Sequence, residues 1–372
     1  MNIGCVKEIK RHEYRVGLTP GDVRSYVSAG HTVRIEATAG VDAGFEDDEY
    51  RRAGAMVVAD REEIFDRSEM IVKVKEPQPE EYGFFRPGQI LYTYLHLAAD
   101  EKLTRALMER KIKGVAYETI EKPDGSLPLL RPMSEIAGRM SIQEGARFLE
   151  RPQGGRGVLL GGVPSVEKGK VAILGGGVVG TNAAKMAVGL GALVTILDVN
   201  IDRLEYLDDI FSGRVTTLYS SRAHIEQVLE ESDLVVGAVL IHGAKAPHLV
   251  TRADLQRMKR GSVIVDVAVD QGGCLETTRP TTHDDPVYIV EDVLHYCVAN
   301  MPGGVSRTAT QALTTATLPS GLAIANLGLE EAARRNQAIA KGINLYQGAV
   351  TYHAVGDAFG IESTPISELL AT

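Results

Sequence analysis

Three glycines between residues 175 and 180 have the spacing that a phosphate-binding turn requires. Gly175, Gly177 and Gly180 fit the pattern G-x-G-x-x-G, and Val178 and Val179 stand between the last two. In such a turn the first glycine permits a tight bend, the second lets the backbone approach a pyrophosphate, and the third lets a helix pack close to a strand. Glycine clusters occur in many turns, so the surrounding segments must decide whether this one binds a nucleotide.

These surrounding segments predict the strand, turn, helix and strand of a dinucleotide-binding unit. The apolar run Val171–Leu174 precedes the glycines, a helical pattern covers Asn182–Gly189, and a second apolar run, Leu193–Asp198, follows. A helix N-terminus at this turn offers unpaired N–H groups and a partial positive charge to phosphates. Asp198 can accept hydrogen bonds from a ribose 2′-hydroxyl and would repel a 2′-phosphate, which favours NAD over NADP. Arg203 weakens that preference, because a nearby arginine can accommodate the phosphate.

Four further polar residues lie in loops or at positions where predicted strands end, and in an α/β sheet that is where ligands bind. They are Arg15 in the loop after Asn2–Val6, Lys75 at the end of Met70–Lys75, His96 after Ile90–Leu95, and Asp270 after Val263–Val267. Two cations, a histidine and a carboxylate suit a small keto or amino acid: Arg15 and Lys75 would clamp its carboxylate, and His96 could act as an acid or base. Taken singly, each has a plainer explanation as a solvated surface charge, a hydrogen-bonded strand-end histidine or a turn residue.

The elements that would position these residues form two sheets. Short apolar runs alternate with helical patterns such as Pro20–Ala29 and Asp100–Arg110, which predicts parallel strands covered on both faces. The expected strands are Asn2–Val6, Thr32–Glu36, Met70–Lys75, Ile90–Leu95 and Gly114–Tyr117 in the first sheet, and Val171–Leu174, Leu193–Asp198, Val215–Tyr219, Leu234–Val239, Val263–Val267 and Val287–Val290 in the second. We therefore expect an α/β protein of two Rossmann-like, doubly wound parallel-sheet domains separated by a cleft.

Two long helical patterns frame the second sheet. Met133–Glu150, followed by the glycine-rich loop Pro152–Pro164, has the character of a domain junction. After Pro302 the pattern becomes alanine-rich and predicts helix over Gln311–Gln347, with a short irregular tail.

Composition narrows the class of protein. A chain of 372 residues with 44% hydrophobic and 24% charged residues is typical of a globular protein of two domains. The net charge of −9 argues against a nucleic-acid partner. The N-terminus reads as a strand rather than an export signal, and Val171–Leu197 holds too many glycines and polar residues for a membrane span. Cys5, Cys274 and Cys297 lack metal-ligand spacing, so we expect free thiols in a reducing cytoplasm and no metal site.

Several motifs together are more specific than the glycine pattern. They are Lys7–Lys10, Glu13–Val16 and Leu18–Pro20 near the N-terminus, then Val74–Pro77, Tyr94–Ala98, Arg131–Glu135, Gly175–Ala184, Val265–Gly273 and Asn300–Gly303. With these motifs the chain resembles the L-alanine dehydrogenase family over nearly its whole length. That family shares its fold with the N-terminal domain of transhydrogenases. A proline that is usual in the stretch after Pro302 is replaced here by Ser306, which is a local change in a loop.

The resemblance implies roles for individual residues. Arg15 and Lys75 would bind the substrate carboxylate and carbonyl, His96 and Asp270 would be the acid/base pair, and His96 and Asn300 would also touch the substrate. Cofactor contacts would come from Ser134, Gly175, Gly177, Val178, Val179, Gly180, Asp198, Arg203, Ser220, Val239, Leu240, Val267, Ala268, Val269, Asp270, Arg279, Val298, Ala299, Asn300 and Met301. The family further implies a homohexamer with a discontinuous substrate domain, residues 1–128 plus 307–372, and an NAD-binding domain, residues 129–306.

The activity implied by the resemblance is the reversible NAD-dependent oxidative deamination of L-alanine to pyruvate and ammonia in the cytoplasm. One alternative is the nucleotide-binding domain of a proton-translocating transhydrogenase, which presents a cofactor and has no substrate of its own. The joint presence of Arg15, Lys75, His96 and Asp270, and the lack of a following membrane span, argue against it. A second alternative is an enzyme of the same fold that acts on a hydroxy acid or a lysine-derived substrate.

Overall fold

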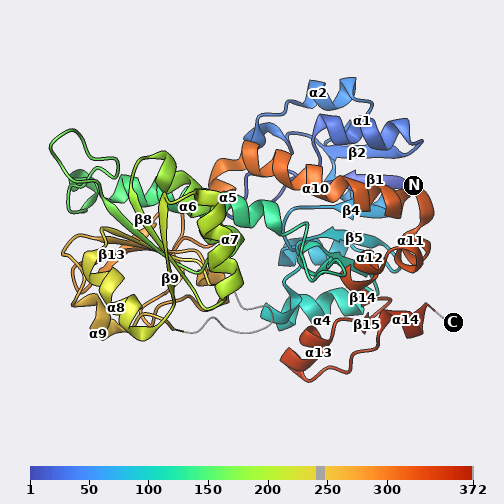
Figure 1. The fold of residues 1–372 in the computed structure, drawn as a ribbon. Coiled ribbons are helices and arrows are strands. Elements are labelled where there is room, and N and C mark those ends of the chain that lie inside the picture. The colour runs from blue at the N-terminus through green and yellow to red at the C-terminus, as the bar shows by residue number, and fades with distance from the viewer. Residues whose placement is uncertain (240–247, 371–372) are drawn as a thin grey trace. The chain divides into compact units, whose positions relative to one another are not determined.

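Two compact units make up the chain in the computed structural model, which describes residues 1–239 and 248–370. Unit 1 comprises Met1–Met133 and Gly303–Thr372, and unit 2 comprises Ser134–Pro302. The first boundary falls inside helix α5 (Arg131–Phe148), where the sequence predicts a junction helix over Met133–Glu150. Each unit is built around one sheet of mostly parallel strands, so the expected α/β fold class is confirmed (Figure 1).

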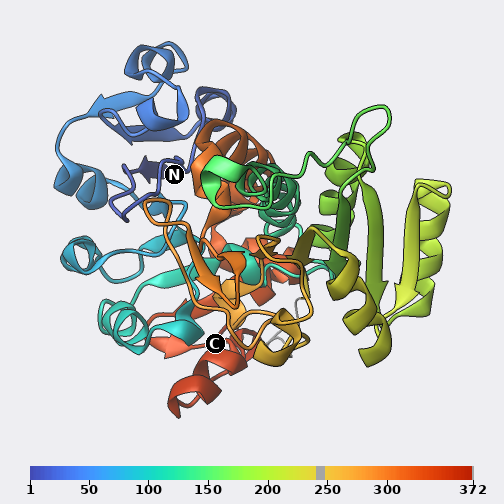
Figure 2. The ribbon, with the colours of Figure 1, turned by 90° about the vertical axis from the view of Figure 1, so that its left-hand side faces the viewer.

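Unit 1 has an eight-stranded sheet in the order β15-β14-β6-β5-β4-β1-β2-β3. Its strands are β1 (Asn2–Cys5), β2 (Thr32–Glu36), β3 (Met56–Val58), β4 (Met70–Val72), β5 (Ile90–Thr93), β6 (Lys113–Ala116), β14 (Ile343–Tyr346) and β15 (Ala349–Val350). Strands β1 to β6 are parallel, whereas β14 pairs antiparallel with both β6 and β15. The segment that returns to this sheet is coloured red in Figures 1 and 2.

The helices of unit 1 begin where the local sequence caps them. Its α-helices are α1 (Pro20–Ser28), α2 (Asp47–Arg52), α3 (Arg61–Arg67), α4 (Glu101–Glu109), α10 (Ser306–Leu327), α11 (Leu329–Arg335), α12 (Gln337–Gly342), α13 (His353–Phe359) and α14 (Ile366–Leu369). At α1, Thr19 and Asp22 form a capping box and Pro20 occupies the first turn. Between sheet and helices, apolar side chains such as Ile71, Leu91 and Leu345 form a buried core.

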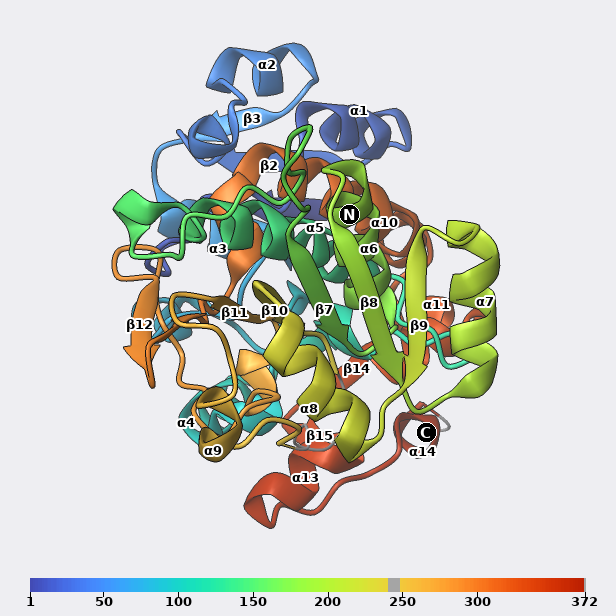
Figure 3. The same ribbon diagram turned by 60° about the vertical axis from the view of Figure 1, so that its left-hand side comes forward.

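Unit 2 has a seven-stranded sheet in the order β12-β13-β11-β10-β7-β8-β9. Its elements are α5, β7 (Lys170–Leu174), α6 (Val178–Gly189), β8 (Leu193–Asp198), α7 (Ile201–Phe211), β9 (Val215–Tyr219), α8 (Arg222–Glu231), β10 (Leu234–Gly237), α9 (Arg252–Leu255), β11 (Val263–Asp266), β12 (Val287–Val290) and β13 (Val293–Tyr296). Among the described strands of unit 2, the edge pair β12 and β13 is antiparallel and the other pairs are parallel. Figure 3 shows β7, β8 and β9 side by side, with α7 next to β9.

The prediction of continuous helix over Gln311–Gln347 is wrong. The chain forms α10, α11 and α12 in turn, and then enters β14 at Ile343. Gly328, at a φ of 80°, breaks the helix after Leu327 in a conformation that other residues rarely adopt. The run Ile343–Tyr346 then pairs with β6, so sheet pairing over a long sequence separation overrides the local helical pattern. The short strands β3, β13 and β15 were not predicted either.

Among the described residues, no single helix has the length and apolar composition needed to cross a membrane. One pair, Met301–Leu327 with Leu329–Arg335, passes that test when taken together, but it is bent by 118°.

Candidate active site

The glycine turn of unit 2 joins β7 to α6, as its sequence predicts. Gly175 has a φ of +104°, and a Cβ there would lie 2.7 Å from the Ala238 carbonyl oxygen. A Cβ on Gly180 would lie 1.8 Å from the Gly175 carbonyl oxygen, so only glycine lets α6 begin this close to the turn. A Cβ on Gly177 would meet nothing within 4 Å. The first and third glycines are therefore required by the fold itself, while the second borders open space.

The N-terminus of α6 fits an anionic group. The helix begins at Val178, four residues earlier than predicted, and its N-cap residue Gly177 makes no side-chain capping hydrogen bond. The backbone N–H groups of the first turn thus have no side-chain acceptor at the cap, and the helix dipole adds partial positive charge. Together with the open space at Gly177, this end of the helix fits the pyrophosphate of a dinucleotide.

Asp198 and Arg203 are both bonded to the glycine turn. The Asp198 carboxylate accepts hydrogen bonds from the backbone N–H of Gly176 at 2.7 Å and of Asn200 at 2.9 Å. The Arg203 Nε donates to the Gly176 carbonyl oxygen at 2.6 Å, and its Nη2 donates to the Thr181 hydroxyl at 2.6 Å. Asp198 is therefore placed at the turn where a ribose beside the pyrophosphate would lie, and Arg203 braces the same turn.

The remaining predicted cofactor residues of unit 2 mostly follow the carboxyl ends of its parallel strands. Ser220 comes directly after β9, and its N–H donates to the Asp198 carbonyl oxygen at 2.9 Å. Val239 follows β10, Val267 to Asp270 follow β11, and Val298 to Met301 follow β13, whereas Ser134 lies on α5. The Arg279 guanidinium stacks over the Tyr288 ring at 4.1 Å. Leu240 lies outside the described residues.

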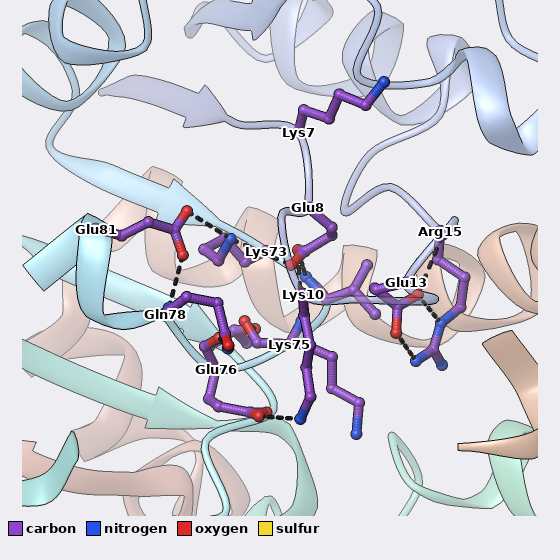
Figure 4. Close-up of polar contacts among 12 residues, drawn as sticks. Lys7, Glu8, Lys10, Glu13, Arg15, Lys73, Lys75, Glu76, Gln78 and Glu81 are labelled. Carbon is purple, nitrogen blue, oxygen red and sulfur yellow. Dashed lines mark hydrogen bonds and ion pairs between the residues drawn. The ribbon is translucent and has the colours of Figure 1, made fainter. Parts of the chain in front are cut away.

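Arg15 is a buried residue of unit 1, only 2% exposed, which rules out the reading as a solvated surface charge. Its Nε and Nη2 each donate to a different oxygen of Glu13 at 2.6 Å, and its backbone N–H also donates to Glu13 at 3.1 Å (Figure 4). Burial works to lower the pKa of Arg15, but the Glu13 carboxylate outweighs it and the pKa is raised. Glu13 therefore fixes both the charge and the plane of the guanidinium.

Lys75 is half-buried three residues beyond the end of β4, which is shorter than predicted. Burial lowers the pKa of its ammonium, with the positive charges of Arg15 and Lys10 acting in the same direction and Glu76 against it. Lys10 forms an ion pair with Glu76 (Figure 4). In the part of unit 1 that the structure describes, the Lys75 ammonium has no hydrogen-bond or ion-pair partner, so it is available to an anionic or carbonyl oxygen.

A buried ionic network lies beneath the backbone that carries Lys75. The Lys73 ammonium pairs with Glu8 at 3.2 Å and with Glu81 at 3.0 Å, and all three side chains are at most 2% exposed. Glu8 also accepts a hydrogen bond from the Val74 N–H at 2.6 Å. Burial raises the pKa of Glu8 to about 7, against the lowering effect of Lys73. This network, visible in Figure 4, anchors the end of β4 without itself being exposed.

His96 stands in a turn after β5 with a φ of 48°, a left-handed conformation that is strained for a residue other than glycine. Glu118, which follows β6, holds this turn by accepting the His96 N–H at 2.6 Å and the Leu95 N–H at 3.2 Å. The same carboxylate lies 3.9 Å from His96 Nδ1. The ring stacks parallel to Tyr94 at 5.8 Å and its side chain is 45% exposed. His96 is thus oriented on one side and open on the other.

Asp270 is exposed on the short 3-10 helix Val269–Gln271, directly beyond β11. Asn300, at a φ of 63°, lies in the loop after β13, just before the 3-10 helix Met301–Val305. The structure therefore places Arg15, Lys75 and His96 in unit 1, and the glycine turn, Asp270 and Asn300 in unit 2. That His96 and Asp270 act on one substrate stays a prediction.

Sequence reasoning missed Glu13 and Glu118. The rule that selected His96, a polar residue just past a strand end, also applies to Glu118 after the predicted strand Gly114–Tyr117. Glu13 stands in the same motif as Arg15, but spacing alone does not show that a carboxylate two residues away folds back onto the guanidinium.

Comparison with known proteins identifies the family. The family model "Alanine dehydrogenase/PNT, N-terminal domain" matches residues 4–137, and "Alanine dehydrogenase/PNT, C-terminal domain" matches residues 141–353. The chain belongs to the alanine dehydrogenase/PNT family. It is 57% identical to an alanine dehydrogenase of Staphylococcus haemolyticus over 371 residues, which cover 100% of this chain and 99% of that protein. Alanine dehydrogenase 2 of Staphylococcus aureus is 56% identical over 100% of both chains.

Solved structures agree with this membership. A structure of L-alanine dehydrogenase superposes with a TM-score of 0.94 and 57% sequence identity, covering 97% of this chain and 99% of that one. A transhydrogenase from Sinorhizobium meliloti superposes with a TM-score of 0.82 at 24% identity, covering 95% of this chain and 100% of that one, which shows the shared fold. Membership of the alanine dehydrogenase family makes the chain an oxidoreductase with a nicotinamide cofactor and small-molecule substrates.

Proposed function

We propose that the protein catalyses the reversible reaction of L-alanine, NAD⁺ and water to pyruvate, ammonium and NADH, with release of one proton. The observation that carries this proposal is the 57% identity to an alanine dehydrogenase over the full length of both chains. The transhydrogenase alternative has less support, since the likeness there is one of fold at 24% identity.

The residues of unit 1 would bind and orient the substrate. Because Glu13 holds the Arg15 guanidinium in a fixed plane, its direction toward a substrate carboxylate is set before the substrate arrives. The Lys75 ammonium would hydrogen-bond the carbonyl oxygen of pyruvate. Binding thereby costs little conformational freedom of the Arg15 side chain.

NAD⁺ held at the glycine turn would supply the acceptor for the hydride that leaves the alanine Cα, and the substrate would become an imine. His96 would move protons to and from the substrate nitrogen and oxygen, with Glu118 fixing the turn that carries its ring. Asp270 would position and activate the water that converts the imine to a carbinolamine, which then collapses to pyruvate. Asn300 would touch the substrate and the cofactor.

The choice of NAD over NADP rests on Asp198. Its carboxylate sits at the glycine turn and would repel a 2′-phosphate, while Arg203 is already bonded to Gly176 and Thr181. The domain roles follow from these assignments: residues 1–128 and 307–372 would form the substrate domain, and residues 129–306 the NAD-binding domain.

We further propose a homo-oligomer, a hexamer by family resemblance, in the cytoplasm. Exposed apolar residues support self-association: Leu159 and Val163 of the glycine-rich loop, together with Val166, Leu190 and Leu193. Three free, buried cysteines are compatible with a reducing compartment. Sedimentation velocity of the purified protein would measure the oligomeric state.

One assay tests the function directly. NADH oxidation is followed with pyruvate in the presence and absence of ammonium. Turnover that requires ammonium is expected. Turnover with pyruvate alone would instead indicate a hydroxy-acid dehydrogenase, and NADH binding without turnover would favour a cofactor-presenting module.

A further inference from the structure

The loop of residues 267–278 begins directly after β11 and carries Asp270. It contains two consecutive glycines, Gly272 and Gly273, both with positive φ. A Cβ on Gly273 would lie 2.3 Å from the Thr278 side chain, so the loop folds back closely on its own end. Such a glycine-containing loop has many conformations available when it is not restrained.

Asp266 supplies that restraint. It is the last residue of β11 and is fully buried. One carboxylate oxygen accepts the N–H of Ala268 at 3.1 Å, and the other accepts the N–H of Cys274 at 2.8 Å and the hydroxyl of Thr278 at 2.5 Å. These donors come from the beginning and the end of the loop, so one side chain ties the two together.

The neighbouring strand makes room for this carboxylate. A Cβ on Gly237 of β10, which pairs with Asp266, would lie 2.9 Å from its Oδ1. Burial of a carboxylate is costly unless donors surround it, and burial raises the pKa of Asp266 against the hydrogen bonds that lower it. The preceding residues of β11 are apolar, so the strand itself does not require a charge at this position.

We propose that Asp266 is a positioning residue for Asp270: it closes the 267–278 loop and so fixes where the Asp270 carboxylate stands. Asp266 is buried and would act through the loop that it closes. This inference rests on the proposed function, in which Asp270 activates water. Misplacement of a reacting group by about 1 Å can lower the rate on the order of 10²-fold.

The test uses the full-length enzyme in three variants. Asp266→Asn replaces one carboxylate oxygen, which accepts hydrogen bonds, by an amide NH₂ group, which would face the N–H and hydroxyl donors of the loop. We expect kcat to fall by about 10²-fold while the KM for pyruvate stays near the wild-type value. Thr278→Val removes one hydrogen bond and should lower kcat less. Thr278→Ser keeps the hydroxyl group and should keep most of the wild-type kcat.

Asp254 offers a matched control in the same unit. It is also a buried carboxylate that accepts a backbone N–H and a hydroxyl, both from Thr251, but it caps α9. Asp254→Asn should lower Tm without lowering kcat at temperatures where the enzyme stays folded. If Asp254→Asn and Asp266→Asn lose kcat in proportion to their loss of Tm, or if Asp266→Asn keeps its kcat, the positioning role is wrong.

Two further outcomes are decisive. If Asp266→Asn does not fold, the Thr278 pair decides, and equal kcat for Thr278→Val and Thr278→Ser overturns the role. If the wild-type enzyme shows no ammonium-dependent turnover, the proposed function fails and the role of Asp266 fails with it. If the wild-type enzyme turns over with ammonium and the variants keep its kcat, the positioning role of Asp266 is contradicted, but the proposed function is not.

Discussion

The charged residues of unit 1 and the glycine turn of unit 2 are held in place by different kinds of interaction. In unit 1, carboxylates fix the candidate residues: Glu13 holds the Arg15 side chain, and Glu118 holds the His96 turn. In unit 2, the turn from β7 to α6 is defined by the absence of side chains at Gly175 and Gly180. Charged supports respond gradually to substitution and to pH, whereas steric supports fail as soon as one carbon is added.

The largest expected effect comes from removing a reacting group in either unit. His96→Ala and Asp270→Asn should each lower kcat by about 10²–10⁴-fold if these side chains transfer protons as proposed. Steady-state rates with pyruvate and ammonium measure this, and the exposed His353→Ala serves as the control. If either variant kept near-native turnover, the substituted residue would not be needed for proton transfer, and an acid/base pair with one residue from each unit would be contradicted.

Adding one methyl group tests the steric support of unit 2. Gly180→Ala would place a carbon 1.8 Å from the Gly175 carbonyl oxygen, so we expect NADH affinity to fall at least about 100-fold, or the protein not to fold. Gly189→Ala, in the same helix with nothing within 4 Å, should leave affinity unchanged. Fluorescence titration measures the NADH affinity of Gly180→Ala and Gly189→Ala, and thermal unfolding measures their Tm. Equal affinities and equal Tm values in the two variants would contradict the steric role of Gly180.

Breaking the Arg15 to Glu13 pair tests the charged support of unit 1. Arg15→Ala should raise the KM for pyruvate about 10- to 100-fold, because a charged hydrogen-bond partner is lost. Glu13→Gln should raise it less, because the guanidinium remains but is held less firmly. Arg51→Ala, which breaks an exposed ion pair with Asp48, should leave the KM for pyruvate unchanged. An unchanged KM in Arg15→Ala would contradict the clamp.

The Asp198 carboxylate supports the glycine turn, and its removal should narrow the preference for NADH over NADPH about tenfold. Asp198→Ala removes both the acceptor and the negative charge, whereas Asp198→Asn keeps an acceptor. The exposed Asp202→Asn, in the first turn of α7, is the control. If the ratio of the two cofactor affinities did not move in either Asp198 variant, another residue would set the preference.

The smallest effect is a change in how stability depends on pH. The pKa of Glu8 is about 7 in the folded protein and about 4.5 when unfolded, so its contribution to stability is present below pH 4.5 and is lost as pH rises through 7. Glu8→Gln has no carboxyl group to ionise at this position, so its stability does not fall for this reason as the pH rises. The Tm of Glu8→Gln minus the Tm of the wild type should therefore increase by a few degrees between pH 4.5 and 8. For Glu62→Gln, which replaces an exposed carboxylate, the difference in Tm from the wild type should not change with pH.

The sequence predicted those parts of the fold that depend on local pattern. The apolar runs from Val171–Leu174 to Val263–Val267 became parallel strands, and the glycine spacing marked the turn. Ile343–Tyr346 was read as helix because its strand partner, β6, lies more than two hundred residues away. Glu13 and Asp266 were missed for a similar reason: their hydrogen-bond geometry depends on the backbone path, which residue spacing does not specify.

The antiparallel pairing of β14 with β6 has a consequence for how the chain folds during synthesis. Unit 2 is continuous in sequence, so all its strands leave the ribosome before Gly303. The sheet of unit 1 must wait for Ile343–Val350 before the edge of β6 is covered. An unpaired edge is a template for association with other chains. Unit 2 can therefore complete its sheet while the β6 edge of the nascent unit 1 is still unpaired and open to association with other chains.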